Sequence, residues 1–134
     1  RSDATLNSGG VRIGTSEIYR VVENIKNIEE CLAAELKLAN DTKVILFVKT
    51  LNNLSLDSVF KNLITNEIKK SLSPKHVPYK IISVLDIPKT KSGKIVEMTV
   101  KKIINFEKIE NIDSISNSEC LKEYYKIAKE INQS

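Results

Sequence analysis

The pattern of apolar and polar residues at the start of the chain predicts a β-hairpin followed by a helix. Two short β-prone stretches, "ATL" and "VRI", flank "NSGG", whose adjacent glycines permit the positive φ angles of a tight turn. Thr15 or Ser16 can then cap a helix with Glu17 as a helix-start residue, and apolar residues recur at positions 18, 21, 22 and 25. We therefore expect a linker and hairpin over residues 1–14 and a helix over about 15–25.

Two strands and a second helix are expected in the middle of the chain. "ECLAAELKL" and "KVILFVKT" are strand-like and are joined by the turn "ANDT". The continuous apolar run "VILFV" is typical of an inner strand that is covered on both faces. Asp57 is placed to cap the following helix, which should end before Pro74 and Pro78. The apolar residues expected on one face of this helix are Val59, Phe60, Leu63, Ile64 and Ile68.

The remaining sequence predicts one more strand and two more helices. "YKIISVLDI" has the composition of a strand, and the loop "PKTKSGK" leads from it to a short helix, "VEMTVKKII", with Val96, Val100, Ile103 and Ile104 on one face. After Phe106 a polar linker precedes a final helix, "SECLKEYYKIAKEI". The apolar stripe expected to pack this helix on the domain is Leu121, Tyr124, Tyr125, Ile127, Ala128 and Ile131. The order ββαββαβαα predicts an α+β fold, in which a small β-hairpin and a sheet of about three strands pack against helices.

Length and composition are those of one ordinary domain, with 134 residues of which 41% are hydrophobic and 28% charged. The sequence has no apolar run of about 18 residues and no signal peptide, which predicts a cytoplasmic protein without a membrane partner. It begins at Arg1 rather than methionine, as expected for a cut made in a longer protein. Cys31 and Cys120 fit no metal-ligand spacing, so we expect reduced, half-buried thiols.

Positive charge is concentrated in one region. Residues 69–102 contain nine lysines against Asp86 and Glu97, a net of 9 − 2 = +7, whereas the whole chain carries +4, which leaves −3 elsewhere. Such a region attracts an anionic partner (nucleic acid, a membrane surface or a phosphorylated small molecule) or is a solvated lysine-rich face. Tyr79 is its only aromatic residue, so the stacking surfaces of a nucleic-acid-binding protein are missing. A stand-alone basic binding module is therefore the weaker alternative, and no nucleic-acid partner is expected.

No complete catalytic or metal-binding motif is present. A P-loop requires G-x-x-x-x-G-K-[ST], but Pro88 lies five positions before Gly93, and Ile95 follows Lys94. His76 is the only histidine and is expected on the surface or at a strand edge. The sequence therefore offers neither a Ser/His/Asp set nor a metal site.

Two glycine-containing loops each precede a positive side chain. Gly9 and Gly10 come before Arg12, and Gly93 comes directly before Lys94. Glycine gives the backbone freedom to move and to approach a ligand closely, and a fixed positive charge stabilises negative charge that develops in a transition state. We expect both loops to contribute to a pocket formed with another domain.

These loops lie in two stretches that resemble a known family. "RSDATLNSGGVRIGTSEIY", followed about 70 residues later by "IPKTKSGKI", resembles the C-terminal domain of the adenylate-forming superfamily, which comprises acyl- and aryl-CoA synthetases, peptide-synthetase adenylation domains and luciferases. "SPKHVPYKII", "SGKIVEMTVKKI" and the tail "NSECLKEYYKIAKEI" resemble acetoacetyl-CoA synthetases more narrowly. Acetyl-CoA synthetases usually have an arginine-rich helix after the lysine loop and lack this tail, so Glu97 and residues 107–134 favour the acetoacetyl enzymes. An acetyl- or propionyl-CoA synthetase is the alternative, because acid specificity lies mainly in the other domain.

The resemblance implies an acid–CoA ligase that uses ATP and CoA as substrates. A short-chain keto acid attacks the α-phosphate of ATP, the C-terminal domain rotates, and the thiol of CoA then displaces AMP. Lys94 matches the catalytic lysine of the first half-reaction, where its charge would be placed between the carboxylate and the phosphate. In this family the same lysine can be acetylated, which would remove that charge. Mg²⁺ is expected to come with ATP and to be bound outside this chain.

The resemblance implies further roles residue by residue. Asp3 matches the hinge position, and Arg1 matches an arginine near the nucleotide ribose. Gly10 and Arg12 match the loop that faces the active site during thioester formation. Gly10 would let the pantetheine arm of CoA pass, whereas Arg12 would either contact phosphate or hold one domain arrangement through salt bridges. Lys69 could meet the 3′-phosphate of CoA or be a solvated lysine.

The same resemblance sets the expected domain boundaries. Residues 1–3 would form the hinge, residues 4–106 the C-terminal domain of the synthetase, and residues 107–134 a helical extension. The family's phosphate-binding loop and acid pocket lie in a large N-terminal domain of the same polypeptide, which would be the main partner of this chain. We therefore expect residues 1–134 to fold but not to catalyse the reaction alone.

Overall fold

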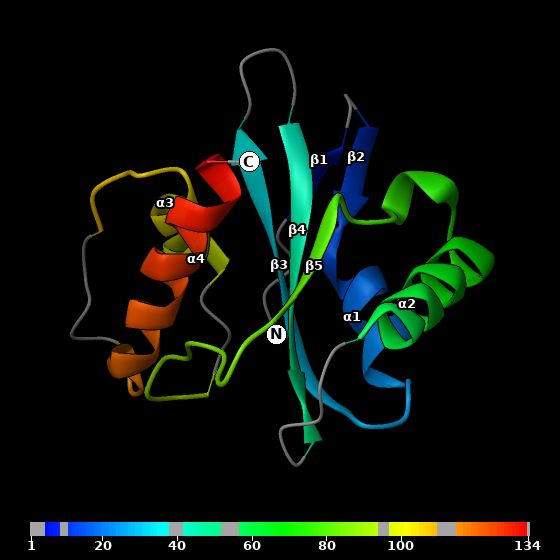
Figure 1. The fold of residues 1–134 in the computed structure, drawn as a ribbon, viewed down its shortest axis with the longest axis horizontal. Helices are drawn as coiled ribbons and strands as arrows, with labels where there is room; N and C mark the ends of the chain where they lie inside the picture. The colour runs from blue at the N-terminus through cyan, green and yellow to red at the C-terminus, as the bar shows by residue number, and fades with distance from the viewer. Residues whose placement is uncertain are drawn as a thin grey trace.

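The computed structural model describes residues 5–8, 11–37, 42–51, 57–93, 97–109 and 115–133. Within them the chain forms β1 (Thr5–Ser8), β2 (Val11–Gly14), α1 (Thr15–Glu23), β3 (Ile28–Lys37), β4 (Thr42–Thr50), α2 (Ser58–Ser71), β5 (Lys80–Ser83), α3 (Glu97–Ile104) and α4 (Leu121–Gln133). Short 3-10 helices occupy Pro74–His76 and Ser118–Cys120. The sheet of β3, β4 and β5 stands between α1 and α2 on one side and α3 and α4 on the other (Figure 1). The predicted α+β class and element order are confirmed.

β4 is the central strand of this mixed sheet. It pairs antiparallel with β3, Leu46 lying opposite Ala33, and parallel with β5, Leu46 lying opposite Ile81. Because successive side chains of a strand point to opposite faces, Phe47 packs toward α3 and α4, whereas Leu46 packs with α1 and α2. Residues 44–48 are buried throughout. The prediction of an inner strand covered on both faces is confirmed.

The final helix packs on the sheet as predicted, with one exception. Leu121, Tyr124, Ile127, Ala128 and Ile131 are buried in the same apolar cluster as β4 and α3. The ring of Tyr124 lies 5.0 Å from that of Phe47, centroid to centroid, with the planes tilted by 57°. Tyr125, however, is 45% exposed. One residue advances a helix by about 100°, which turns Tyr125 away from the stripe, so its predicted place in the core is wrong.

The N-terminal hairpin and helix also agree with the sequence, apart from the helix cap. β1 and β2 pair antiparallel, with Leu6 opposite Ile13, while the turn glycines lie outside the described residues. α1 ends at Glu23, two residues before the expected end. Its N-cap is Gly14 in extended conformation, so neither Thr15 nor Ser16 caps it. Thr15 is instead the first helical residue and is fully buried, because β2 runs directly into the helix.

α2 begins as predicted but buries fewer of its apolar residues. The N–H of Phe60 donates to Asp57 Oδ1 at 2.9 Å, which confirms the predicted cap. Ile64 and Ile68 are fully buried, whereas Val59 is 77% and Leu63 46% exposed. Around the helix axis, Val59 and Leu63 are turned by about 140° and 100° from Ile64. Their predicted place on the buried face is therefore wrong.

The third strand of the sheet is shorter than the predicted 79–87. β5 ends at Ser83, and the N–H of Val84 makes a last bond to Val48 O at 2.9 Å. Beyond that point the N–H of Leu85 donates to Glu123 Oε1 of α4, at 2.9 Å, instead of to β4. The apolar sequence continues as a strand would, but the backbone leaves the sheet because the C-terminal segment offers it other partners.

Candidate functional site

The structure leaves most of the site residues inferred from the sequence untested. Those outside the described part of the chain are Arg1, Asp3, Gly10 and Lys94. The backbone of Arg12 lies in β2 opposite Asn7, but its side chain is not described. Lys69 is exposed in the last turn of α2. The roles of these residues stay predictions, and the described residues on either side of Lys94 carry the geometry of the region.

A tight turn leads directly into Lys94 along the sequence. The N–H of Gly93 donates to Thr90 O at 2.9 Å, and the hydroxyls of Thr90 and Ser92 lie 2.9 Å apart. Gly93 has φ +88°, in the left-handed region that residues with a Cβ rarely adopt. A Cβ built on Gly93 would meet no atom within 4 Å, so backbone conformation rather than lack of space calls for glycine here.

The segment before this turn is held by residues just before α4 and in its first turns. Asn117 Oδ1 accepts the N–H of Lys89 at 2.9 Å, while its Nδ2 donates to Ile87 O at 2.8 Å and to Asp86 Oδ2 at 2.9 Å. The hydroxyl of Tyr124 donates to Asp86 O at 2.8 Å. Two segments about 30 residues apart in sequence therefore lie side by side at one end of the sheet.

Charged side chains from the sheet join this contact. Lys49 Nζ of β4 lies 3.3 Å from Asp86 Oδ1 and 2.9 Å from Glu29 Oε2. Lys89 Nζ forms an ion pair with Glu30 Oε2 of β3. The lysine loop, the C-terminal segment and the sheet thus meet in one partly buried network of charges and hydrogen bonds.

The network perturbs its two central charges. Burial alone would raise the pKa of Asp86, but the hydrogen bonds from Asn117 and the N–H of Ile87, with the charge of Lys49, hold it below its usual value. The hydrogen bond to Glu29 raises the pKa of Lys49 against the opposing effect of burial, with Asp86 adding to the rise. Both side chains are therefore held in their charged forms at neutral pH.

A second polar contact fixes the residue at which α3 begins, three positions after Lys94. Glu97 is 6% exposed, and its Oε2 accepts the hydroxyl of Tyr19 from α1. Tyr19 Oη also accepts the N–H of Ala33 at 3.0 Å. Glu97 Oε1 is buried without a hydrogen-bond partner in the described part of the structure. Burial and the neighbouring Glu97 raise the pKa of Tyr19 well above its usual value, so this hydroxyl stays protonated and can donate.

The histidine links the first sequence motif to the end of α2. His76 Nε2 lies 3.0 Å from Glu17 Oε2, and its Nδ1 lies 2.7 Å from Ser73 Oγ. The His76 side chain is 17% exposed and lies in a 3-10 turn, so it is partly at the surface and not at a strand edge. Glu17 lies in the first turn of α1, as predicted.

The two cysteines form no disulfide, and they differ in exposure. Cys31 is fully buried on β3, so the predicted half-burial is wrong for this residue, because β3 has its core-facing side chains on both faces. Cys120 is half-buried, as predicted. Burial, followed by the negative charges of Asp86 and Glu123, raises the pKa of Cys120 to about 11. A thiolate is therefore disfavoured at this position at neutral pH.

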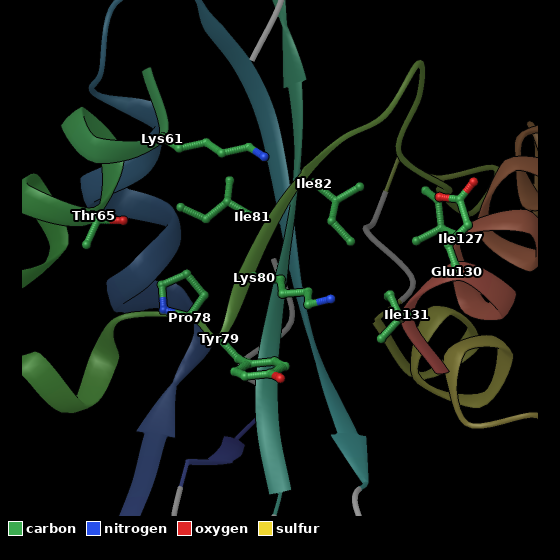
Figure 2. A pocket seen from close by; sticks show the side chains of 10 residues that line it. All are labelled: Lys61, Thr65, Pro78, Tyr79, Lys80, Ile81, Ile82, Ile127, Glu130 and Ile131. Carbon is green, nitrogen blue, oxygen red and sulfur yellow. The ribbon is translucent and has the colours of Figure 1, made fainter. Parts of the chain in front are cut away.

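A groove of about 560 Å³ opens beside β5. Lys61 and Thr65 of α2 form one wall and Ile127, Glu130 and Ile131 of α4 the other. Figure 2 shows Ile81 and Ile82 pointing to opposite sides of β5, toward these two walls. The charged residues of its lining are Lys61, Lys80 and Glu130.

Some of the lysines in the basic region are neutralised. Lys89 pairs with Glu30, and Lys101 Nζ lies 3.5 Å from Glu35 Oε2. Among the described residues no group of three or more His, Cys, Asp or Glu side chains could hold a metal ion. In the same residues we find no helix with the length and apolar character needed to cross a membrane.

Comparison with known proteins finds similar sequences and structures, although no family model matches the chain. The sequence is 46% identical over 121 residues to acetoacetyl-coenzyme A synthetase of Rhizobium meliloti, a match that covers 90% of this chain and 19% of that enzyme. The structure of acetoacetyl-CoA synthetase from Streptomyces lividans matches 97% of this chain and 20% of its own, with a TM-score of 0.78 and 34% identity. This chain is a homologue of acetoacetyl-CoA synthetases.

The relationship extends to other acyl-CoA synthetases. The acyl-CoA synthetase of Brucella canis matches 76% of this chain with a TM-score of 0.69 and 25% identity. The fold is that of the C-terminal domain of adenylate-forming acyl-CoA synthetases, as the sequence motifs predicted. The chain spans about a fifth of the length of the curated relatives it matches.

Sequence reasoning did not single out the residues that hold the lysine loop. Asn117, Glu123 and Tyr124 lie in a tail that the sequence predicted as a linker and an amphipathic helix and that carried part of the family resemblance. Asn117 carried a weak signal, because asparagine just before a helix commonly bonds to neighbouring backbone. That signal did not predict that Asn117 binds the distant segment 86–89.

Proposed function

We propose that this chain is the C-terminal domain of an ATP-dependent acid–CoA ligase, which converts acetoacetate, ATP and CoA to acetoacetyl-CoA, AMP and pyrophosphate. The observation that carries the proposal is the 46% identity to an acetoacetyl-CoA synthetase over 90% of the chain. The acid pocket and the phosphate-binding loop would lie in an N-terminal domain of the same polypeptide, so residues 1–134 alone would be inactive. Mg²⁺ would accompany ATP in that domain, and the enzyme would be cytoplasmic.

Lys94 would act in the first half-reaction. As the carboxylate oxygen bonds to the α-phosphorus, negative charge accumulates between the two groups, and an ammonium placed there stabilises the transition state more than the ground state. Loss of one such group commonly slows a reaction by about 10²–10³, which corresponds to about 2.7–4 kcal/mol. Acetylation of Lys94 would have the same effect, because it removes the charge.

The second half-reaction would use the loop that contains Gly10 and Arg12, after the domain rotates about Asp3. Gly10 would let the pantetheine arm of CoA pass close to the backbone. Arg12 would contact phosphate or hold the rotated arrangement, Lys69 would meet the 3′-phosphate of CoA, and Arg1 would lie near the ribose. The exposure of Lys69 in α2 is compatible with that contact.

Substitution of Lys94 tests the proposal in the full-length protein. Lys94→Ala should abolish ATP–pyrophosphate exchange, because the adenylation transition state loses its positive charge, while thioester formation from supplied acetoacetyl-AMP largely survives. Lys91→Ala is the matched control, since Lys91 is an exposed lysine of the same turn. Wild-type rates in both half-reactions of Lys94→Ala would show that the role of Lys94 is wrong.

The identity of the acid needs its own assay. Full-length protein supplied with acetate, propionate, acetoacetate and butyrate should show the highest kcat/KM for acetoacetate. A preference for acetate or propionate would instead identify another short-chain acyl-CoA synthetase.

A further inference from the structure

The segment between β5 and the lysine turn is irregular backbone that still needs hydrogen-bond partners. The C-terminal segment supplies them: Glu123 accepts the N–H of Leu85, Tyr124 donates to the carbonyl of Asp86, and Asn117 binds both Ile87 and Lys89. Pro88 has no N–H to satisfy. Backbone that the sheet no longer holds is thus held by the chain 30 residues further on.

The contact continues to the edge of the turn itself. The N–H of Ser116 donates to Lys89 O at 2.9 Å, and Thr90 forms an antiparallel bridge with Ile115. Ile115 is 5% exposed, so this bridge is anchored in the core rather than lying loosely on the surface. Thr90 then begins the turn to Gly93, the residue directly before Lys94.

The C-terminal segment that makes these contacts is itself packed against the core. Tyr124 packs on Phe47 of β4, and Leu121 is buried beside it in the cluster that joins α4 to α3 and the sheet. Figure 1 shows the start of α4 and the segment after β5 lying side by side at the same end of the sheet. The sheet therefore holds the lysine loop through α4 and the residues before it, in addition to the direct ion pairs of Lys49 with Asp86 and of Lys89 with Glu30.

We propose that the C-terminal segment 115–124 positions the lysine loop for adenylation, with Asn117 as its main positioning residue. This rests on the proposed role of Lys94. Asn117 would not touch the substrates. It would restrict the orientations of the turn before Lys94, so that a larger fraction of them places the lysine productively beside the α-phosphate. The thioester half-reaction does not use Lys94 and should be insensitive to Asn117.

The chain contains a matched control for Asn117. Asn105 also bridges backbone groups through its amide: Oδ1 accepts the N–H of Lys37 at 2.7 Å, and Nδ2 donates to Glu35 O at 2.9 Å and Lys101 O at 2.7 Å. It is half-buried like Asn117. Lys37 lies at one end of β3, and Glu30, the partner of Lys89, lies near the other. Asn105→Ala thus removes comparable bonds far from the lysine loop.

The test compares both half-reactions of the full-length protein. Asn117→Ala should lower kcat of acetoacetate-dependent ATP–pyrophosphate exchange about tenfold, with thioester formation from supplied acetoacetyl-AMP near the wild-type rate. Amide hydrogen exchange of Lys89 should become faster in the same variant. Asn105→Ala should leave both half-reactions and the exchange of Lys89 unchanged.

Two results would overturn the proposal: an unchanged exchange rate for the Lys89 amide, or an equal loss in both half-reactions, which marks general destabilisation. If Asn117→Ala fails to fold, Tyr124→Phe serves instead, because it removes only the hydroxyl that binds Asp86 O and keeps the ring on Phe47. Lys94→Ala separates the two proposals: if that variant exchanges pyrophosphate at the wild-type rate, the proposed role of Lys94 fails, whereas the hydrogen exchange of Lys89 still reports on the anchoring.

Discussion

The hydroxyl of Tyr19 links α1, β3 and α3 at the outer edge of the sheet. β3 is an edge strand among the described strands, so its outer N–H groups need partners other than a neighbouring strand. Tyr19 Oη accepts one of them, from Ala33, and its hydroxyl donates a hydrogen bond to the carboxylate of Glu97. A buried carboxylate is costly unless it is hydrogen-bonded, so this contact determines whether α3 can begin inside the core.

Removal of that hydroxyl should destabilise the chain measurably. Tyr19→Phe leaves the N–H of Ala33 and the carboxylate of Glu97 without this partner, and we expect a loss of about 1–3 kcal/mol in the free energy of unfolding. Tyr125→Phe is the control, since Tyr125 is 45% exposed and should change stability by less than about 0.5 kcal/mol. Urea denaturation monitored by circular dichroism measures both. Equal stability of the two variants would mean that the buried contact contributes nothing.

The stability of α2 depends strongly on the capping of its first turn, because few of its residues are buried. Only Ile64 and Ile68 of its described residues are fully buried, whereas Val59 and Leu63 remain exposed. Little packing energy therefore supports its first turn, and local capping matters correspondingly more. The Asp57 carboxylate supplies the cap and also places a negative charge at the positive end of the helix.

The cap of α2 is testable with conservative variants. Asp57→Ala should reduce the free energy of unfolding by about 1 kcal/mol, because the N–H of Phe60 loses its acceptor. Asp57→Asn keeps an acceptor at the same place and should recover most of that loss. Chemical denaturation midpoints compare the two, and a variant pair with identical midpoints would contradict the capping role.

Over the whole molecule, the network around Asp86 ties the lysine loop, the C-terminal segment and the sheet together. The folded pKa of Asp86 lies below its usual value of 3.8, so the folded state binds the proton more weakly than the unfolded chain. The stabilisation by Asp86 is therefore complete above about pH 3.8 and is lost as the pH falls through the lower, folded pKa. Acid should loosen the contact between loop and tail before it affects the two apolar cores.

That dependence predicts how an Asp86→Asn variant behaves. The variant should be less stable than the wild type at about pH 6, and the difference should shrink at about pH 3, because Asp86 of the unfolded wild-type chain, with its usual pKa of 3.8, takes up a proton there. Glu119→Gln, at an exposed carboxylate of the tail, is the control. Urea unfolding at the two pH values gives the comparison. A stability difference that stays constant with pH would show that charge at Asp86 does not matter.

The sequence by itself determined the order of the elements, the α+β class and the relationship to acyl-CoA synthetases. Each depends on local information: the run of apolar residues in β4, the cap at Asp57, and two motifs whose letters can be compared directly. The candidate role of Lys94 came from such a motif as well. Apolar periodicity and short motifs can be recognised from the sequence because they depend on residues close together along the chain and not on tertiary contacts.

The tertiary structure decided which apolar residues are covered and what holds the lysine loop. Val59 and Tyr125 have the same apolar character as their buried neighbours. They are exposed because the faces of their helices on which they lie point away from the sheet. The contacts of Asn117 with Lys89 and of Tyr19 with Glu97 join residues 28 and 78 positions apart. Such pairings depend on how helices dock across the sheet, and no spacing along the chain encodes that docking.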